Sequence, residues 1–521
     1  MTFARSFLTA TLLATTALPG LAADLTIGRS NEPSSMDPQF SRTGNNQMTA
    51  KLMFDRLVAF GPNLNPSPGL AASWEPIDET TWEIKLREGV TFHDGSPLTV
   101  EDVVFSLERT DEVPNSPAPF SNNVADIKSM EKVDDKTLRI ETLAPAPLLM
   151  DAVGQVFIVS KAATENATSQ DFNSGHATIG TGPYKFGAWS PGENLTITAY
   201  EGYWGDAPEF KDVDIRFITN DAARVAALLA GDVDLIDAVP PTDIARLEND
   251  ENITVISKSS GRVIYLGLTQ RDEFPEITDL QGKPLSENPF KDPKVRKAVS
   301  LMIDRKLIID RILGGSGVPA GQLVPDVLGG HSTDTPPDEV DIEAAKALLT
   351  EAGYPDGFGI TIYSSNDRFP GDGDLAQALG QMLARGGLKV NGVQTVPYNV
   401  YSKAASAGDY SVFVFSLGSS TPSSAPNLNG LLRTHDKEAG SGPFNRVRFS
   451  DAEFDAALDA AMQEFDPQKR NAMLADATAK VFQKMPVVPL YWQKVHWAAR
   501  KGLTIDGGLS EDTLAQDVSS E

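Results

Sequence analysis

The amino-acid sequence predicts a protein of mixed α/β class. Short segments in which apolar and polar residues alternate, as they do in strands, are interleaved along the chain with longer segments of helical periodicity. Many of the helical segments begin at a capping residue or a proline, and several end at glycine. The length of 521 residues is enough for roughly three or four domain-sized units. We therefore expect several α/β units made from one chain.

The composition is that of an ordinary globular protein with a strong acidic excess. Hydrophobic residues make up 41% and charged residues 22%, and 71 Asp and Glu face 45 Lys and Arg, for a formal net charge of -26. Such a surface repels nucleic-acid phosphate and anionic lipid headgroups, so neither is an expected partner. The chain has no cysteine, which excludes disulfides, thiolate zinc sites, a thiol nucleophile and a lipid-anchored cysteine.

Residues 1–22 differ from the rest and are interpreted as a signal peptide. One positive charge, Arg5, precedes an apolar run at about 7–18, and small residues follow it. The run is too short for a membrane span, and no second apolar segment of about twenty residues follows. We expect export to the periplasm, cleavage near Ala22 or Ala23, and a mature chain without a direct membrane anchor. An amphipathic N-terminal helix is the alternative.

Particular elements follow from the same patterns, in chain order. Strands are expected at 24–30, 81–92, 195–200 and 210–218, then a helix at 220–230 that stops at Gly231 with an extended segment after it. In the second half, helices are expected at 294–313 after an Asp292–Pro293 cap, at 341–353, at 450–463 after a Ser450-x-x-Glu453 capping box, and at 466–483, followed by a short apolar strand at 485–493.

The stretch "FHDGSPLTVEDVVFSLER" (92–109) bears on catalysis because it places a histidine beside an aspartate. Asp94 and the glycine after it form a turn dipeptide. Thr99 is the expected N-cap of a helix, and Asp102 completes a capping box three residues later. Because every residue of the stretch then has a structural explanation, His93 is interpreted as a turn histidine and not as a catalytic one.

The rest of the chain offers little chemistry for an enzyme. No histidine lies three or four residues from another, so no helical metal pair exists. Nucleophile elbows, phosphate-binding loops and dinucleotide fingerprints are missing from the sequence. We expect no catalytic residue, no metal and no cofactor. The residues by themselves leave two interpretations, a large exported binding protein and a cryptic hydrolase.

Six segments form an ordered pattern over nearly the whole mature chain. They are "GLAASWEPIDETTWEIKLREGVTFHDGSPLTVEDVVFSLER" (69–109), "GTGPYKF" (180–186), "YEGYWGDAP" (200–208), "LLAGDVDLI" (228–236), "FKDPKVRKAVSLMIDRKLI" (290–308) and "LLTEAGYPDGF" (348–358). In this order they resemble the family 5 bacterial extracellular solute-binding proteins. That family includes the peptide-, oligopeptide- and nickel-binding components of ABC importers.

The resemblance implies a two-lobed periplasmic-binding-protein fold. In this fold two α/β lobes are joined by two crossover strands, and an extra α+β domain is inserted in lobe I. The matching limits place lobe I at 24–55, 183–266 and 497–521, the extra domain at 56–182 and lobe II at 267–496. Closure of two lobes buries a ligand on all sides, and a membrane permease can recognise the closed form.

The resemblance also implies ligand contacts in lobe I and in the extra domain. In peptide-binding relatives the loop after the first strand contributes an acid that faces the ligand, and the matching residue is Glu32 in "NEPSSMDP". A turn-forming acid is the alternative for this position. In some relatives an aromatic residue after the first helix of the extra domain reaches the cleft, and the matching residue is Phe120 in "SPAPFSNN".

Lobe II departs from the pattern of the di- and oligopeptide binders. Those relatives carry a segment with Trp and several Gly and Asp residues, one Asp of which pairs with the amino terminus of the peptide. The corresponding stretch, "YSVFVFSLGSSTPSSAPNL", has no acid and no Trp; Gly418, Ser419 and Ser420 offer backbone amides and hydroxyls instead. A buried α-ammonium without a carboxylate is costly. Either Glu32 takes that role or the ligand is not a dipeptide with a free amine.

Four further residues are candidate ligand contacts. Arg368 lies in a loop after an expected strand, where a guanidinium can bind a carboxylate through two hydrogen bonds; a solvated loop arginine is the alternative. Tyr265, Phe415 and Trp492 lie near expected strand ends, where their rings can stack on a ligand or pack in the core.

The sequence therefore predicts a periplasmic, non-catalytic solute-binding component of an ABC importer, acting as a monomer. It is expected to capture a small peptide or peptide-like organic solute with at least one carboxylate by lobe closure, and to deliver it to the inner-membrane permease. Receptors for an opine, a sugar conjugate or a metal chelate are the alternatives within this class. A periplasmic hydrolase or a peptide chaperone is the alternative outside it.

Overall fold

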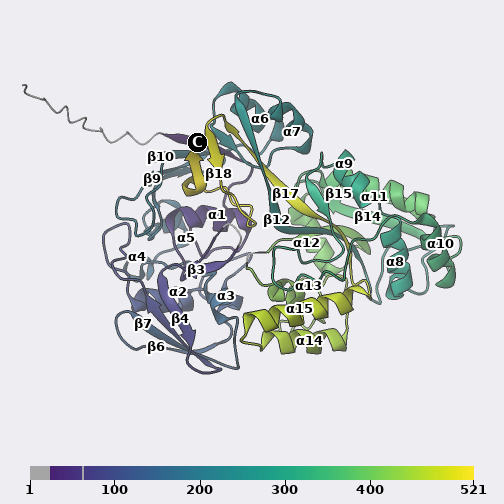
Figure 1. Ribbon diagram of the computed structural model, residues 1–521, viewed down its shortest axis with the longest axis horizontal. Helices are drawn as coiled ribbons and strands as arrows, with labels where there is room; N and C mark the ends of the chain where they lie inside the picture. Colours follow the sequence, from purple (N-terminus) through teal and green to yellow (C-terminus); the bar gives the residue numbers. More distant parts are fainter. Residues whose placement is uncertain (1–23, 62–63, 420) are drawn as a thin grey trace, which may run out of the picture.

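The computed structural model describes residues 24–61, 64–419 and 421–521. The expected signal peptide and its cleavage point near Ala22 or Ala23 lie outside these residues. Within the described part of the chain, no helix combines the length and the apolar character that a membrane span requires. Figure 1 shows two bodies, one containing β9, β10 and α1 and the other containing α8 to α11, connected by β12 and β17. The two-lobed α/β fold predicted from the sequence is thus confirmed.

One mixed sheet runs through both lobes. Its order is β15–β14–β16–β12–β17–β11–β1–β10–β9–β8, with β13 paired to β17. The strands are β1 (Leu25–Arg29), β8 (Tyr184–Ser190), β9 (Asn194–Ala199), β10 (Asp212–Phe217), β11 (Leu235–Ile236), β12 (Ile253–Leu268), β13 (Gly317–Pro319), β14 (Gly359–Ser365), β15 (Lys389–Val396), β16 (Val412–Leu417) and β17 (Val488–Arg500). The long strands β12 and β17 are antiparallel neighbours, and they pair with strands of both lobes.

In lobe II, helices cover both faces of the sheet. Ile264 and Leu266 of β12 belong to one apolar cluster, whereas Val263 and Tyr265 belong to another, as the two-residue period of a strand requires. The first cluster includes residues of α8 (Pro293–Leu301), α9 (Arg305–Arg311), α10 (Ile342–Glu351) and α11 (Asp372–Gly386). The second includes residues of α12 (Tyr398–Ala407), α13 (Ala425–Leu431), α14 (Ala452–Met462) and α15 (Pro467–Phe482).

Lobe I and the extra domain share one hydrophobic cluster. It joins Leu25 and Ile27 of β1 to Ile84 and Leu107 of the extra domain, so the two parts pack as one body. Its elements include α1 (Gly44–Met53), α2 (Val100–Arg109), α3 (Leu149–Val153), α5 (Ser169–Asn173) and a sheet of order β4 (Ala71–Pro76), β5 (Thr81–Leu86), β7 (Thr137–Thr142), β6 (Ile127–Lys132). On the other face of the lobe I sheet, a smaller cluster holds α6 (Asp221–Ala230) and α7 (Pro241–Glu248). The predicted lobe limits themselves stay predictions.

Short elements complete the fold. They are β2 (Val58–Phe60), β3 (Pro66–Pro68), β18 (Leu503–Ile505), β19 (Val518–Ser520), α4 (Lys161–Thr164) and the 3-10 turns η1 (Ser121–Asn123), η2 (Pro289–Lys291) and η3 (Ala515–Asp517).

The stretch around His93 has the structure that its residues predict. The carboxylate of Asp102 accepts the backbone N–H and the hydroxyl of Thr99 at 2.9 and 2.7 Å, which completes the predicted capping box of α2. The His93 ring is buried; its Nε2 lies 3.0 Å from the carbonyl of Gly182, and its Nδ1 accepts the N–H of Gly180. Burial lowers the pKa of His93 to about 4. The imidazole is therefore neutral and joins the turn at 93–95 to the segment 180–182.

Three expected elements differ from the structure. The helix expected at 294–313 is two helices. Asp304 caps the start of α9, and the Arg305 guanidinium donates a hydrogen bond to the carbonyl of Ser300 near the end of α8. The cap of α14 is Asp451, which accepts two backbone N–H groups, and not Ser450. The short strand expected at 485–493 is part of β17, which continues to Arg500 because it pairs with β12 into lobe I.

Candidate ligand-binding cleft

A cavity of about 750 Å³ lies between the two lobes. Residues 30–31, 42–45 and 237–239 line it from lobe I, and residues 367–370 and 397–399 line it from lobe II. Cavities that bind small organic molecules have volumes of about 300–1,000 Å³. No described residue between 56 and 182 lines this cavity, so its walls come from the two lobes and the strands that connect them.

The cavity borders β17 where one edge of this strand has no neighbouring strand. On that edge β13 pairs with β17 up to Gln493, and β11 pairs with it from Ala498 onward. Residues 493–497 all line the cavity. Two bonds close the ends of the gap: the N–H of Lys494 donates to Ser316, and the carbonyl of His496 accepts from Val239, each at 3.2 Å. The connection between the lobes therefore also forms part of the binding site.

Arg262 and Glu511 form an ion pair on the wall of the cavity. The guanidinium donates to the carboxylate from Nε at 2.9 Å and from Nη2 at 2.8 Å, a two-pronged geometry. Although burial opposes its charge, the carboxylate of Glu511 raises the pKa of Arg262. The pair joins β12, at its register shift between the lobes, to the segment that follows β18. It is satisfied without a ligand.

Arg368 enters the same cavity from lobe II without such a partner. Its guanidinium lies over the ring of Tyr398, 4.9 Å from the centroid, and forms no ion pair with any described residue. The loss of solvent around it and the charge of Arg262 lower the pKa of Arg368. The carboxylate of Asp372 accepts the backbone N–H of Arg368 at 3.0 Å and the hydroxyl of Ser365 at 2.7 Å, which fixes the loop after β14.

Two further cations line the cavity without an acidic partner among the described residues. Lys494 of β17 is half-buried, and no hydrogen bond of its ammonium group is formed with the described chain. Arg42, just before α1, donates weakly to the side chain of Asn123 at 3.3 Å. Burial lowers the pKa of Arg42. Both side chains therefore retain donors for an anionic group.

The acids of the cavity wall are largely engaged within the protein. Asp512 pairs with Lys51, and Glu511 with Arg262 as described above. Asp237 accepts the N–H of Ser30 at 2.7 Å and lies 3.8 Å from the guanidinium of Arg224. Asp367 accepts the N–H of Tyr398 at 2.7 Å but forms no ion pair within the described chain. The cavity thus has three unpaired cations against one unpaired carboxylate.

His496 of β17 contributes a buried imidazole next to the cavity. Its Nδ1 lies 2.7 Å from the hydroxyl of Ser257, and burial followed by the charge of Lys494 lowers its pKa to about 4. The ring is neutral near pH 7. Among the described residues no group of three or more His, Cys, Asp or Glu side chains comes together in the way that metal ligands do.

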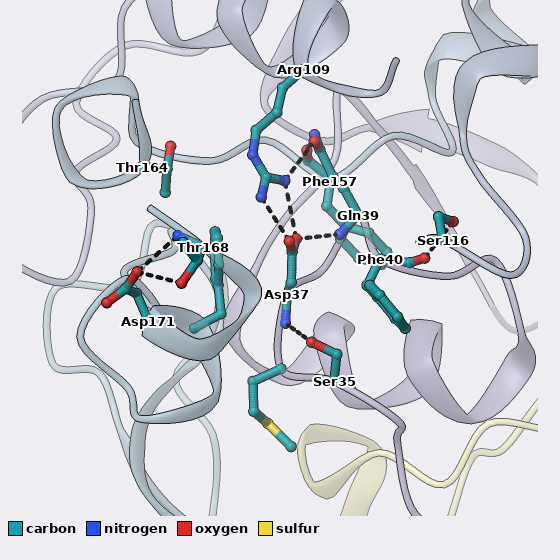
Figure 2. Close-up of polar contacts among 12 residues, drawn as sticks. Ser35, Asp37, Gln39, Phe40, Arg109, Ser116, Phe157, Thr164, Thr168 and Asp171 are labelled. Carbon is teal, nitrogen blue, oxygen red and sulfur yellow. Dashed lines mark hydrogen bonds and ion pairs between the residues drawn. The ribbon is translucent and has the colours of Figure 1, made fainter. Parts of the chain in front are cut away.

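A buried ion pair behind the cavity holds the wall of lobe I in place. Figure 2 shows the guanidinium of Arg109, from α2 of the extra domain, reaching Asp37 and Gln39 in the loop after β1. Its two terminal nitrogens donate to the Asp37 carboxylate at 3.0 and 2.6 Å, and one also donates to Gln39 at 3.0 Å. Gln39 in turn donates to the carbonyls of Ser106 and Phe157, both at 2.9 Å. The extra domain therefore anchors the loop that leads from β1 to α1.

Among the candidate residues from the sequence, Arg368 lines the cavity. Glu32 is next to a lining segment, but its carboxylate accepts the N–H of Gly192 at 2.7 Å. Phe120 is buried against Phe157 and lines a separate cavity of about 240 Å³ between the extra domain and Phe444. Arg42 lines this second cavity as well as the one between the lobes.

The aromatic candidates of lobe II pack in its interior. Tyr265 and Phe415 are 1% and 5% exposed, and both belong to the cluster that faces α12 to α15. Trp492 packs against the same cluster and lies edge-on to His331, 5.8 Å between centroids. None of the three is part of the described lining, because on this face of the sheet side chains point toward helices.

The candidate loop after β16 lies beside Arg262. Gly418 approaches its guanidinium closely, and the hydroxyl of Ser419 accepts a hydrogen bond from Asn427. Ser420 lies outside the described residues. Neither Gly418 nor Ser419 is part of the cavity lining. All the candidate contacts, Arg368 included, stay predictions of ligand contact.

Several lining residues are not among the candidates from the sequence. They include Arg42, Tyr398, Lys494, Glu511 and Asp367, which directly precedes Arg368. The stretch "SSNDRFPGDGD" contains an acid beside the arginine, and this pair is the one local signal for Asp367. The other residues come from segments far apart in the chain, and only the folded arrangement brings them together.

The fold and the cavity define the class of protein. Two lobes connected by two strands, with a cavity between them that is lined in part by charged side chains, are typical of solute-binding proteins that close around a ligand. The chain belongs to the bacterial extracellular solute-binding proteins, family 5, whose family model matches residues 65–439. As a member of this family it is a solute-binding component of an ABC importer.

Named relatives cover almost the whole chain. The glutathione-binding protein GsiB of Salmonella typhimurium is 25% identical over 499 residues, which are 94% of this chain and 93% of the relative. The heme-binding protein A of Haemophilus influenzae is 28% identical over 475 residues, 85% of this chain and 82% of the relative. Both relatives are named as binding proteins and not as enzymes.

Solved structures share the fold over the same extent. The binding protein AgaA of A. tumefacien, in complex with agropinic acid, has a TM-score of 0.77 and 26% identity, covering 96% of this chain and 99% of that one. The binding protein DppA of Helicobacter pylori, in complex with the peptide STSA, has a TM-score of 0.80 and 24% identity, covering 96% and 98%.

Proposed function

We propose that the chain captures a small peptide or peptide-like organic solute that carries at least one carboxylate. The observation behind this proposal is Arg368, which enters the cavity with its guanidinium unpaired among the described residues. A guanidinium binds a carboxylate through two parallel hydrogen bonds, and the Tyr398 ring beneath it restricts its orientation. Closure of the lobes would bury this contact and strengthen it, because fewer water molecules compete.

A peptide ligand also needs a partner for its α-ammonium group. The loop after β16 has no acid, and the carboxylate of Glu32 is engaged with Gly192. Asp367 lines the cavity beside Arg368 and keeps one oxygen free of backbone contacts. We therefore assign Asp367, in place of Glu32, as the acceptor for an amine where the solute has one. Glutathione, agropinic acid and heme, named for the relatives, are test solutes for this chain.

We further propose that the mature chain acts in the periplasm as a monomer, without catalysis, and delivers its solute to the inner-membrane permease. The apolar run at about 7–18 supports export, and the naming of relatives as binding proteins supports a receptor role. A hydrolase would convert its solute. Mass spectrometry of the solute after prolonged incubation separates the two, since a receptor returns it unchanged.

The test is calorimetric titration of the chain from Ala23 with glutathione, the peptide STSA, agropinic acid and heme. Saturable binding of a carboxylate solute that Arg368→Gln weakens at least about tenfold supports the proposal. Arg385→Gln is the matched control, because Arg385 is an exposed arginine on α11 outside the cavity. The proposal is overturned if binding of these solutes is indifferent to Arg368→Gln, or if only a solute without a carboxylate binds.

A further inference from the structure

The charges that line the cavity do not balance once the internal ion pairs are counted. Four cations and four acids line it, but Arg262 and Glu511 neutralise each other, and Lys51 and Arg224 approach Asp512 and Asp237 from behind the wall. Three cations then remain, Arg42, Arg368 and Lys494, against the single carboxylate of Asp367 among the described residues. The closed cavity would hold an excess of about two positive charges.

The unpaired cations come from different elements. Arg368 belongs to the loop after β14 in lobe II, Arg42 precedes α1 in lobe I, and Lys494 belongs to β17. Arg42 has a weak acceptor in Asn123, whereas the ammonium group of Lys494 has no partner in the described chain. Two separate anchors, Arg368 and Lys494, therefore line the cavity from two different elements, the loop after β14 and the strand β17.

Uncompensated charge is costly in a site that closes. Removing water from a lone ammonium or guanidinium is strongly unfavourable unless an opposite charge replaces the water. A solute with one carboxylate neutralises one anchor and leaves the other. A solute with two carboxylates neutralises both anchors, because its second carboxylate pairs with the ammonium group of Lys494.

We propose that the cleft selects solutes with two carboxylates, one bound by Arg368 and the other by Lys494. This inference rests on the proposed function and narrows its ligand class. Lys494 is a specificity-determining residue in this arrangement. Lys494 belongs to β17, one of the two strands that connect the lobes, so the second carboxylate would contact this connection.

The experiment uses solute pairs that differ by one carboxylate: glutathione against its C-terminal amide, and Ala-Glu against Ala-Gln. Calorimetric titration of the mature chain is expected to give at least about tenfold tighter binding for the dicarboxylate of a pair. In Lys494→Gln this ratio is expected to fall toward one, because only the dicarboxylate loses a partner. Lys501→Gln, which removes an exposed lysine just after β17, is the matched control and keeps the ratio.

The outcomes separate this inference from the proposed function. Equal affinities within each pair, or a ratio that survives Lys494→Gln, overturn the dicarboxylate inference while binding that depends on Arg368 leaves the function standing. Loss of the ratio in Lys494→Gln with the control unchanged supports the inference. If no member of either pair binds, the inference and the peptide-like ligand class are both rejected.

Discussion

Arg109 and Arg368 carry the same guanidinium group, but the first is paired with an acid inside the protein and the second faces the cavity without an ion pair to any described acid. Arg109 is 8% exposed, and Asp37 and Gln39 accept three hydrogen bonds from its two terminal nitrogens. Arg368 faces the interlobe cavity with the ring of Tyr398 as its neighbour and no acid paired to it in the described chain. An arginine paired within the chain contributes to the fold. An arginine left unpaired in a concave site marks where a solute completes the hydrogen bonds.

The largest effect is expected from breaking the paired arginine. Arg109→Met leaves the carboxylate of Asp37 buried without its cation, and removal of one partner of a buried pair costs about 3–5 kcal/mol. We expect the free energy of unfolding in urea to fall by that amount, and solute binding to weaken because the loop after β1 loosens.

Arg385→Met is the control for this change, because the exposed arginine on α11 has no ion pair in the described chain. Its free energy of unfolding is expected to stay within about 0.5 kcal/mol of the parent. A loss of under 1 kcal/mol in Arg109→Met would contradict the structural role of the pair.

The buried His93 extends the comparison from arginines to an imidazole whose nitrogens are bonded within the protein. Both ring nitrogens of His93 are bonded, and its pKa is about 4 in the folded state against 6.5 as an ordinary value. Between these values the unfolded chain binds the proton and the folded one does not, so stability is lost as the pH falls from 6.5 toward 4. The free energy of unfolding that is lost through His93 over this pH range is up to about 3 kcal/mol.

Urea unfolding of the parent and of His93→Gln at pH 7, 6 and 5 measures this contribution. The stability advantage of the parent over the variant is expected to shrink as the pH falls through this window. His176→Gln, at an exposed histidine, serves as the control. An advantage that is independent of pH would mean that His93 is not held neutral.

Breaking the unpaired arginine should leave the fold intact. Arg368→Gln removes no ion pair of the described chain, so the free energy of unfolding is expected to change by no more than about 0.5 kcal/mol. The affinity for the bound carboxylate solute is expected to fall about ten- to a hundredfold. Chemical unfolding without solute and calorimetry with it give the two numbers. A large loss of stability would place Arg368 in the same category as Arg109.

The smallest expected effect comes from turning a paired arginine into an unpaired one. Glu511→Gln removes the charge opposite Arg262 in a half-buried pair, and we expect unfolding to become easier by about 1 kcal/mol. The freed guanidinium adds a cation to the cavity, so solutes with a single carboxylate should bind more tightly than they do to the parent. Unchanged binding would indicate that Arg262 does not reach the solute.

The sequence predicts best what depends on neighbours along the chain. The strand at Thr81–Leu86 and the capping box of α2 were predictable because alternation and cap chemistry act over a few residues. The interruption between α8 and α9 was not, because the apolar period continues through it. Only the folded structure shows that Asp304 caps a new helix there and that the Arg305 side chain covers the freed carbonyl.

The candidate site follows the same division. Arg368 could be proposed from the sequence because an arginine in a loop after a strand has a recognisable chemistry. Lys494 could not, because what distinguishes it is the gap beside β17 between β13 and β11 and the lack of an ion pair with any described acid, and both are properties of the fold. Tyr265 and Phe415 look like binding aromatics in the sequence, yet the strand period turns both toward helices.

The contrast between an acidic protein and a cationic cavity has a kinetic consequence. Outside the cavity an approaching dianion is repelled by a net charge of -26, over a range set by the Debye length, which is about 8 Å at physiological ionic strength and longer in dilute salt. The attraction of Arg368 and Lys494 acts only once the dianion is inside the mouth of the cavity. Added salt weakens the long-range repulsion first, so the association rate constant for such a solute is expected to rise with ionic strength, the reverse of electrostatic steering.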